Sequence, residues 1–476
     1  MNAQVGELDN APADVAPVTR IVAEWVANLK LEDIPEASLK HARRALLDSL
    51  GCGIYGSEQE WCQLATIVAE ENSFGGPCAV WGAGKRVGPA DAAMVNGTGI
   101  HGFEIDDLHV ESMLHPGAVI LPAVIALAEA RNLSGKDILR GLVVGYEIGI
   151  RTAICSSIEH KLKGYQMTPT NGTIGAAAAA AATLGLNVEK TNDAIGISVS
   201  FASGLYSARK GAMTKRLHGG LAARNGVLAG LLAEKGFTGA KDGLEVDFGG
   251  YFSTLGENSD LSIMTDDLGS RWHIDDIGFK AYASCGSTHT TVDCVKKLMD
   301  EGLSADNLES LTVRISKAGF TNVGWKYEPV GIVGMQKNGR FVAATQLLKG
   351  EVFVNQFSVD RMEDPDTLEL IKKIDIVHDP EIDALGLAKR HTVVVTAKDS
   401  SGKEYKTTRE QRKGSAQFPL SDAELESKFR RTAGVVIPEK TADRIVELAG
   451  SIETAETSEE LSSLLLGQAQ IPLARL

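Results

Sequence analysis

Apolar residues recur at helical spacing through the first part of the chain. Two such patterns lie between residues 18 and 50, and the second is predicted to end at the glycines of residues 51–53. Another apolar run covers residues 118–128, Ser134 and Asp137 have the spacing of a capping box, and an alanine-rich run covers residues 175–186. These patterns predict a helical domain over residues 18–272.

Three glycines, Gly141, Gly145 and Gly149, lie on one face of the helix predicted after Ser134. Glycine destabilises a helix by about 1 kcal/mol relative to alanine. The packing of a neighbouring helix against these glycines must therefore contribute more stability than they cost. Charged residues at positions 140, 147 and 151 argue against the membrane version of this pattern. The glycines therefore predict a tightly packed helical core.

The pattern changes after about residue 270. Alternation at residues 311–315 and in the segments 392–397 and 404–407 predicts strands, with a helix at 337–348 between them. Helical periodicity then returns, at residues 422–429, 441–448 and 459–465. The predicted fold is mainly α, with a large all-helical domain and an inserted smaller α+β domain. The predicted segments are a flexible tail at 1–17, the helical domain at 18–272, the insert at 273–410 and a helical return at 411–476.

Composition and charge narrow the classes of partner and compartment. The 476 residues carry a net charge of -14, which argues against nucleic acid as a partner but still permits a cationic pocket. The six cysteines form no C-x-x-C pair, which fits a reducing cytoplasm. The first ten residues lack the features of a signal peptide, and no apolar run is long enough to span a bilayer. We therefore expect a cytoplasmic protein without a membrane partner.

The densest cluster of proton-transfer groups lies at residues 101–117, directly before the apolar run at 118–128. A polar loop mounted on a buried helix is a typical setting for catalytic residues. This loop contains Glu104, Asp106, Asp107, His109, Glu111 and His115.

Cationic residues occur in two further segments. Residues 207–220 hold four Lys or Arg together with His218, between apolar segments and glycines, which favours anion binding over a solvated face. Lys280 lies five residues before Cys285. Residues 161–172 are predicted to form a polar loop before the helix at 175–186, whose N-terminus could bind an anion or simply be capped.

A histidine, carboxylates and cations together suit the removal or delivery of a proton next to a carboxylate group. A base exchanges the proton, and cations stabilise the negative charge that develops on the substrate. Loss of a hydroxyl would make the reaction a dehydration, return of the proton to the other face an epimerisation, and loss of CO2 a decarboxylation. The residue pattern alone leaves these three reactions open.

Two other chemistries have weaker support. Asp106, His109 and His115 could form a metal site of two histidines and one carboxylate, but the chain has no H-E-x-x-H motif. Cys285 could be a nucleophile activated by Lys280 and His289, although a packed cysteine without reactivity is more common. We therefore predict no metal site.

The motifs taken together resemble the MmgE/PrpD family, which includes dehydratases, decarboxylases and epimerases of polycarboxylates. The resemblance implies a helical domain, a smaller inserted lid, an active site in the cleft between them, a homodimer, and catalysis without a metal or organic cofactor. The matching segments are Asn96-Gly-Thr, Asp106-Asp-Leu-His, Leu114-His-Pro-Gly-Ala, Gly145-Tyr-Glu-Ile-Gly-Ile-Arg, Gly172-Thr-Ile-Gly-Ala, Thr214-Lys-Arg-Leu-His and Lys280-x-Tyr-x-Ser-Cys.

The resemblance also implies roles for single residues. His115 aligns with a catalytic histidine of the family, and Lys215 and Lys280 align with its active-site lysines. Glu104 stands where an aspartate is usual, and Leu108 where a threonine is usual.

Three departures from the family pattern bear on the reaction. Gln166 stands where many members have a histidine, Phe341 where a tyrosine is common, and Cys285 where some members have a histidine. Glutamine, phenylalanine and a neutral cysteine are poor general acids, so the resemblance favours dehydration over decarboxylation.

The sequence thus predicts a cofactor-independent lyase for a small anionic carboxylate, most of all a hydro-lyase similar to 2-methylcitrate dehydratase. The alternatives are an epimerase, a decarboxylase, and a carboxylate-binding protein without catalysis. The predicted catalytic residues are His115, Asp106, His109, Lys215 and Lys280. The predicted substrate-binding residues are Glu104, Gln166, Arg216, His218, Cys285 and Phe341.

Overall fold

The computed structural model describes residues 17–210, 212–256, 258–386 and 389–467, without the side chains of residues 209 and 210. The fold is mainly α. Nearly all of the predicted tail at residues 1–17 lies outside the described residues. None of the described helices is both long and apolar enough to cross a membrane.

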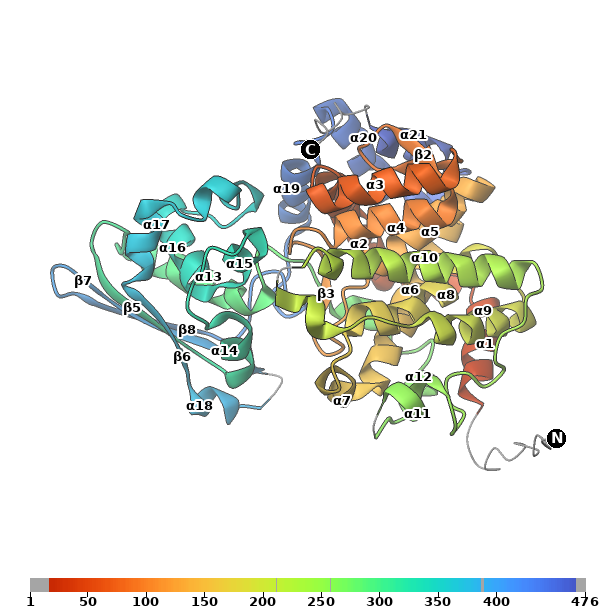
Figure 1. Ribbon diagram of the computed structural model, residues 1–476, viewed down its shortest axis with the longest axis horizontal. Helices are drawn as coiled ribbons and strands as arrows, with labels where there is room; N and C mark the ends of the chain where they lie inside the picture. The colour runs from red at the N-terminus through yellow and green to blue at the C-terminus, as the bar shows by residue number, and fades with distance from the viewer. Residues whose placement is uncertain (1–16, 211, 257, 387–388, 468–476) are drawn as a thin grey trace, which may run out of the picture.

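Helices form the larger lobe, on the right of Figure 1, and the last three of them return to it from the end of the chain. Its helices are α1 (Val18–Asn28), α2 (Glu36–Gly56), α3 (Glu60–Ser73), α4 (Pro89–Ile100), α5 (Gly117–Arg131), α6 (Gly135–Cys155), α7 (Ser157–Leu162), α8 (Met167–Thr183), α9 (Val188–Phe201), α10 (Thr214–Glu234), α11 (Tyr251–Leu255), α12 (Ser262–Thr265), α19 (Asp422–Ala433), α20 (Glu439–Gly450) and α21 (Glu459–Leu466). A short hairpin joins β1 (Cys78–Val80) to β2 (Lys85–Val87).

A four-stranded sheet organises the smaller lobe, on the left of Figure 1. The strand order is β6-β5-β7-β8, with β5 and β6 parallel and the other pairs antiparallel. The strands are β5 (Leu308–Ile315), β6 (Ile374–His378), β7 (Val393–Asp399) and β8 (Glu404–Arg409). The accompanying helices are α13 (Gly286–Asp300), α14 (Lys317–Val323), α15 (Ile332–Lys337), α16 (Gly339–Lys349), α17 (Pro365–Ile371) and α18 (Pro380–Asp383).

The sheet buries one face, as its alternating pattern requires. Val313 and Val395 face each other across β5 and β7 and are fully buried, and they belong to a cluster that includes Val295 of α13 and Ala344 of α16. Other residues of the smaller lobe, among them Phe341, instead belong to the core of the larger lobe. The two lobes therefore share part of one hydrophobic core.

The three spaced glycines of α6 lie where that helix meets its neighbours. A Cβ atom on Gly145 would come within 2.4 Å of Ile120 in α5, and one on Gly175 of α8 would lie 2.7 Å from the Cα atom of Gly149. The side chain of Ser134 accepts the N–H of Asp137 and completes the predicted capping box. The predicted close helix packing and the predicted helix start are both confirmed.

Two predicted helix boundaries are wrong. Helix α2 continues through the glycines of residues 51–53, because Gly51 packs on Phe429 of α19 and Gly53 on the Trp81 ring. Burial there outweighs the low helix propensity of glycine. Helix α8 begins at Met167, so residues 168–171, which were predicted to lie in a loop, form its first turns.

Candidate active site

The loop between α4 and α5, which contains the predicted acid–base cluster, is held from several sides. Its residues Leu108–His109 form β3, which pairs with β4 (Ile277–Gly278). This pairing brings the segment that continues to Lys280 against the loop. The loop also contains Glu104 at φ 57, a left-handed backbone that non-glycine residues seldom adopt.

Asp107 fastens the end of this loop to the helical core. Its carboxylate accepts the N–H of Gly117 at 3.0 Å and the hydroxyl of Tyr146 at 2.7 Å. Complete burial raises the pKa of Asp107 to about 7, although the bond from Tyr146 opposes this change. Asp107 is therefore a structural anchor of the site, placed away from the cavity.

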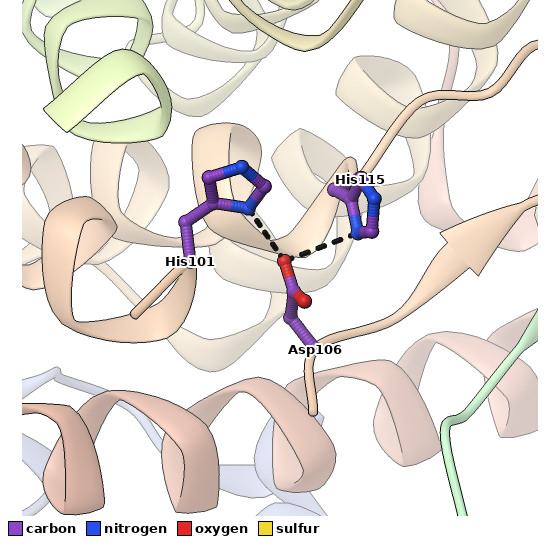
Figure 2. Close-up of side chains that lie close together, drawn as sticks. All are labelled: His101, Asp106 and His115. Carbon is purple, nitrogen blue, oxygen red and sulfur yellow. Dashed lines mark hydrogen bonds and ion pairs between the residues drawn. The ribbon is translucent and has the colours of Figure 1, made fainter. Parts of the chain in front are cut away.

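Two imidazole rings converge on one carboxylate oxygen, as Figure 2 shows. The Nδ1 atom of His101 lies 2.7 Å from Oδ2 of Asp106, and Nδ1 of His115 lies 3.1 Å from the same oxygen. Burial lowers the pKa of His101 to about 3 despite the attraction of Asp106, so this ring stays neutral. Asp106 is thus hydrogen-bonded to His101 and lies within ion-pair distance of Nδ1 of His115, which leaves Nε2 of His115 for other partners. The Asp106–His115 pair is called the dyad below.

A set of cations surrounds Glu104 next to this dyad. Its carboxylate lies 2.7 Å from Nζ of Lys215, 3.0 Å from Nη1 of Arg216 and 3.4 Å from Nζ of Lys280. Lys280 also lies 3.3 Å from Oδ1 of Asp106, so it links the two carboxylates. This network places the predicted residues from three distant segments within one contact shell.

The charges in this network shift one another's titration. Burial alone would raise the pKa of Glu104 and of Asp106, but the neighbouring cations hold both pKa values well below the usual range. Burial would lower the pKa of Lys280, but Asp106 and Glu104 outweigh it and raise that pKa. Burial lowers the pKa of Lys215 to about 8, because one carboxylate shared among several cations compensates it only in part. Lys215 thus loses its charge as pH rises through about 8.

A cavity of about 130 Å³ lies against these groups. A second one, of about 430 Å³, lies beside it and shares lining residues with it, including Glu104, His115 and Cys285. The two cavities together are called the cleft. His115 exposes 18% of its side chain and Lys215 14%, whereas Asp106 exposes 1%. The ring of His115 and the ammonium group of Lys215 can therefore touch a ligand that Asp106 cannot reach.

The structure brings most of the predicted site residues to this cleft. Glu104, His115, Gln166, Lys215 and Cys285 line the smaller cavity, and Lys280 lines the larger one. Asp106 lies directly behind His115. His218 reaches the cleft only through Gln166, whose side-chain oxygen bonds to its ring.

Three predicted site residues lie elsewhere. His109 bonds to Ser112 through Nδ1 and is not part of the Asp106 dyad, so assistance by His109 has no geometric basis. Arg216 is 1% exposed and donates to Glu104 and to the carbonyl oxygen of His101, so it acts behind the cavity wall. Phe341 is completely buried and stacks on Tyr327, so it contacts the core instead of a ligand.

Sequence reasoning missed several residues of the cleft. His101 lies in the same loop, five positions before Asp106, and that proximity was the signal that could have identified it. Thr168, which accepts the N–H of His115, was assigned to a loop because the start of α8 was placed too late. Lys337 lines the smaller cavity from the end of α15, and no local pattern distinguishes it from a surface lysine.

A metal ion needs several His, Cys, Asp or Glu side chains whose ligand atoms lie close together. Among the described residues at the cleft, only His101, Asp106 and His115 meet this condition. Both Nδ1 atoms, however, already point at one oxygen of Asp106, and the ammonium group of Lys280 lies 3.3 Å from the other. A divalent ion would have to displace or repel that ammonium group. The donor set fits a carboxylate in contact with two imidazole rings and an ammonium group better than a metal centre.

Fold and site together define a mainly helical protein with a buried acid–base dyad beside a cationic cleft. The MmgE/PrpD N-terminal domain model matches residues 20–263, and the MmgE/PrpD C-terminal domain model matches residues 282–454. The chain belongs to the MmgE/PrpD family, which confirms the resemblance found in the sequence motifs.

Several relatives are similar over most of their length. The cis-aconitate decarboxylase-like protein oryM of Aspergillus oryzae is 32% identical, covering 95% of this chain and 98% of the relative. A cis-aconitate decarboxylase of Aspergillus terreus is also 32% identical, covering 96% and 97%. The mitochondrial 2-methylcitrate dehydratase of Yarrowia lipolytica is 23% identical, covering 78% and 74%. Decarboxylases and dehydratases of this kind are lyases.

Proposed function

We propose that this protein is a lyase that acts on a small polycarboxylate without a metal or organic cofactor. The observation that carries the proposal is the Asp106–His115 dyad, which opens on a cleft that Lys215 also lines. Asp106 orients the His115 ring, and Nε2 exchanges a proton with the substrate carbon next to a carboxylate. Lys215 binds that carboxylate and stabilises the negative charge that develops there.

Two lyase reactions use this arrangement. In dehydration, the reaction predicted from the sequence, His115 removes a proton and the hydroxyl group leaves with a proton from a second donor. In decarboxylation, the bond to the departing CO2 breaks, its electron pair stays on the substrate carbon, and the His115 imidazolium supplies the proton. The second reaction needs only one proton donor, and it is favoured by the longer and closer similarity to decarboxylases.

The departures from the family pattern bear on this choice less than the sequence suggested. Phe341 is packed in the core, and Gln166 carries an imidazole partner in His218. Their presence therefore argues little against decarboxylation. We further propose that the protein is a cytoplasmic homodimer and that the smaller lobe, whose residues 285–287 line the cleft, acts as its lid.

The test is a screen of small di- and tricarboxylates with purified protein, read as CO2 release, water loss and deuterium uptake from solvent. Turnover that withstands exhaustive chelation is expected. The variant His115→Gln is expected to lose turnover by about a hundredfold to ten-thousandfold, the range for loss of a general acid–base group. His378→Gln is the matched control, because that ring lies in the smaller lobe beside Asp383. Full turnover in His115→Gln would overturn the proposal, and binding without exchange would identify a non-catalytic carboxylate-binding protein.

A further inference from the structure

Arg412 occupies an unusual electrostatic position next to the cleft. Its residue is 1% exposed, and none of its three guanidinium nitrogens has a hydrogen-bond partner among the described residues. A charged group taken out of water without a partner is strongly disfavoured, so such groups are normally paired or bound to a ligand. Arg412 is thus a buried positive charge without a hydrogen-bond acceptor among the described residues.

The N-terminus of α13 adds a second source of positive potential beside Arg412. This helix has 15 residues and its N-cap, Cys285, provides no side-chain acceptor. In the described part of the chain, the N–H groups of Gly286 and Ser287 have no hydrogen-bond partner. A Cβ atom on Gly286 would lie 3.3 Å from Nη1 of Arg412, so the guanidinium group lies against the positive end of the helix dipole. Two sources of positive potential therefore coincide at one point.

This point opens onto the larger part of the cleft. Gly286, Ser287, Arg390 and His391 line the cavity of about 430 Å³, together with His115 and Lys280. Arg390 donates to the carbonyl oxygen of Val110 through one nitrogen only, at 2.6 Å, and its other nitrogens can bind a further acceptor. The positive groups thus lie on the wall of the larger cavity, next to Cys285, which also lines the smaller one.

The carboxylates nearby leave most of this charge uncompensated. Asp293 is the carboxylate whose charge raises the pKa of Arg412. It already accepts the hydroxyl of Tyr282 at 2.6 Å and the N–H of Lys413 at 2.9 Å. Glu111 is exposed, lines the same cavity and acts on Arg390, so it compensates part of the charge of that guanidinium group. Burial lowers the pKa of Arg412 to about 10, which still leaves the guanidinium charged at neutral pH.

We propose that the N-terminus of α13, Arg390 and the guanidinium group of Arg412 form a second carboxylate subsite, which selects substrates with a carboxylate remote from the reacting carbon. The N–H groups of Gly286 and Ser287 and the free nitrogens of Arg390 contact this carboxylate, while Arg412 attracts it across Gly286. The inference rests on the proposed function and specifies its substrate class. With Lys215 holding the carboxylate next to His115, a di- or tricarboxylate occupies both subsites.

The test compares binding of propane-1,2,3-tricarboxylate, which has no hydroxyl or double bond to react, with binding of butyrate, which has a single carboxylate and no remote one. The wild-type protein is expected to bind the tricarboxylate about tenfold more tightly, the value of one charge-assisted hydrogen bond. Arg412→Met and Arg390→Gln are expected to remove this preference. Lys389→Gln is the matched control, because that neighbouring cation pairs with Glu410 outside the cleft. Arg409→Met is the matched control for Arg412→Met, since Arg409 lies over the Phe418 ring.

A second readout separates binding from a structural role. Removal of a buried charge without a partner should leave the ligand-free Arg412→Met protein at least as thermally stable as the wild type. A lower melting temperature together with an unchanged tricarboxylate preference would overturn the inference. If Arg412→Met does not fold, Arg390→Gln decides by the same preference.

The outcomes also distinguish this inference from the proposed function. A wild-type protein that turns over a polycarboxylate but shows no preference for the tricarboxylate overturns the subsite and leaves the lyase. A preference that depends on Arg390 or Arg412, without turnover of any polycarboxylate, supports the subsite and overturns the lyase. If the protein binds neither probe, the proposed subsite is overturned.

Discussion

Lys215 is the residue through which pH should act on substrate binding. Burial lowers its pKa to about 8 and Glu104 opposes that change only in part, so the ammonium group loses its proton as pH rises through about 8. We expect the Kd for propane-1,2,3-tricarboxylate to increase above that pH, by up to about tenfold per pH unit. Lys215→Arg keeps its charge and should move the increase to higher pH. The Kd is measured by calorimetry from pH 6 to pH 10 in steps of about one unit.

The control for this pH profile is Lys235→Arg, because Lys235 exposes 75% of its side chain at the end of α10. Its profile should match the wild-type profile. A Kd that stays constant through pH 8 in the wild-type protein would contradict the role given to Lys215.

For single residues, the sequence predicted which side chains would lie close together, but it did not predict where each side chain would point. His115, Asp106 and Lys280 were predicted as one group, and their atoms do meet. His109, three positions after Asp106, points away, because β3 alternates its side chains and a backbone at positive φ reorients the residues around Glu104. Distance along the chain limits how far apart two residues can be, whereas the φ and ψ angles of a loop decide where each side chain points.

The packing of α8 on α6 depends on glycine at the contact. In Gly175→Ala, the new Cβ would lie 2.7 Å from the Cα atom of Gly149 and 2.8 Å from the carbonyl oxygen of Gly145. Backbone atoms cannot move aside as a side chain can, so we expect a loss of about 1–3 kcal/mol in the free energy of unfolding. Urea denaturation measures it.

The matched control is Gly450→Ala at the end of α20, where no atom lies within 4 Å of the new Cβ. This change should leave stability equal or raise it by up to about 1 kcal/mol, because alanine restricts the unfolded chain more than glycine does. Equal effects of the two substitutions would show that the α6–α8 contact does not require glycine.

Helices and strands were the most predictable elements, and their ends the least. The hairpin of β7 and β8 and the helix α16 were found from periodicity because their buried faces repeat with the period of the element. The end of α2 was misplaced because partners from elsewhere in the chain, Phe429 and Trp81, stabilise helix where local propensity is low. The start of α8 was also misplaced, by several residues. Local signals cannot report such partners.

Across the whole molecule, Lys428 connects the returning C-terminal segment to the site. Its Nζ atom lies 2.6 Å from Asp48 of α2 and donates to the carbonyl oxygen of Ile105, next to Asp106. Lys428→Met should lower the free energy of unfolding by about 3–5 kcal/mol, because it leaves Asp48 buried without its counter-charge. The same change should reduce turnover, since the loop carrying Asp106 loses an anchor.

A double variant isolates the ion pair. Asp48→Leu combined with Lys428→Met removes both charges and should recover most of the lost stability, leaving the cost of the Ile105 bond. Lys440→Met, on the exposed face of α20, is expected to change stability by less than about 0.5 kcal/mol. A double variant as unstable as Lys428→Met alone would assign the effect to packing and not to charge.

The order of helical, mixed and helical segments was already determined by the sequence, because hydrophobic periodicity is a local property that each segment carries by itself. The sequence also led to the prediction of His115, Asp106, Lys215 and Lys280 as site residues, through their side-chain chemistry and through the motifs shared with the family. Only the tertiary structure decided that His101 joins Asp106, that Phe341 belongs to the core, and that Arg412 lies against the N-terminus of α13. Those relations join residues far apart in the chain or turned by a loop, and they depend on how the packed elements meet.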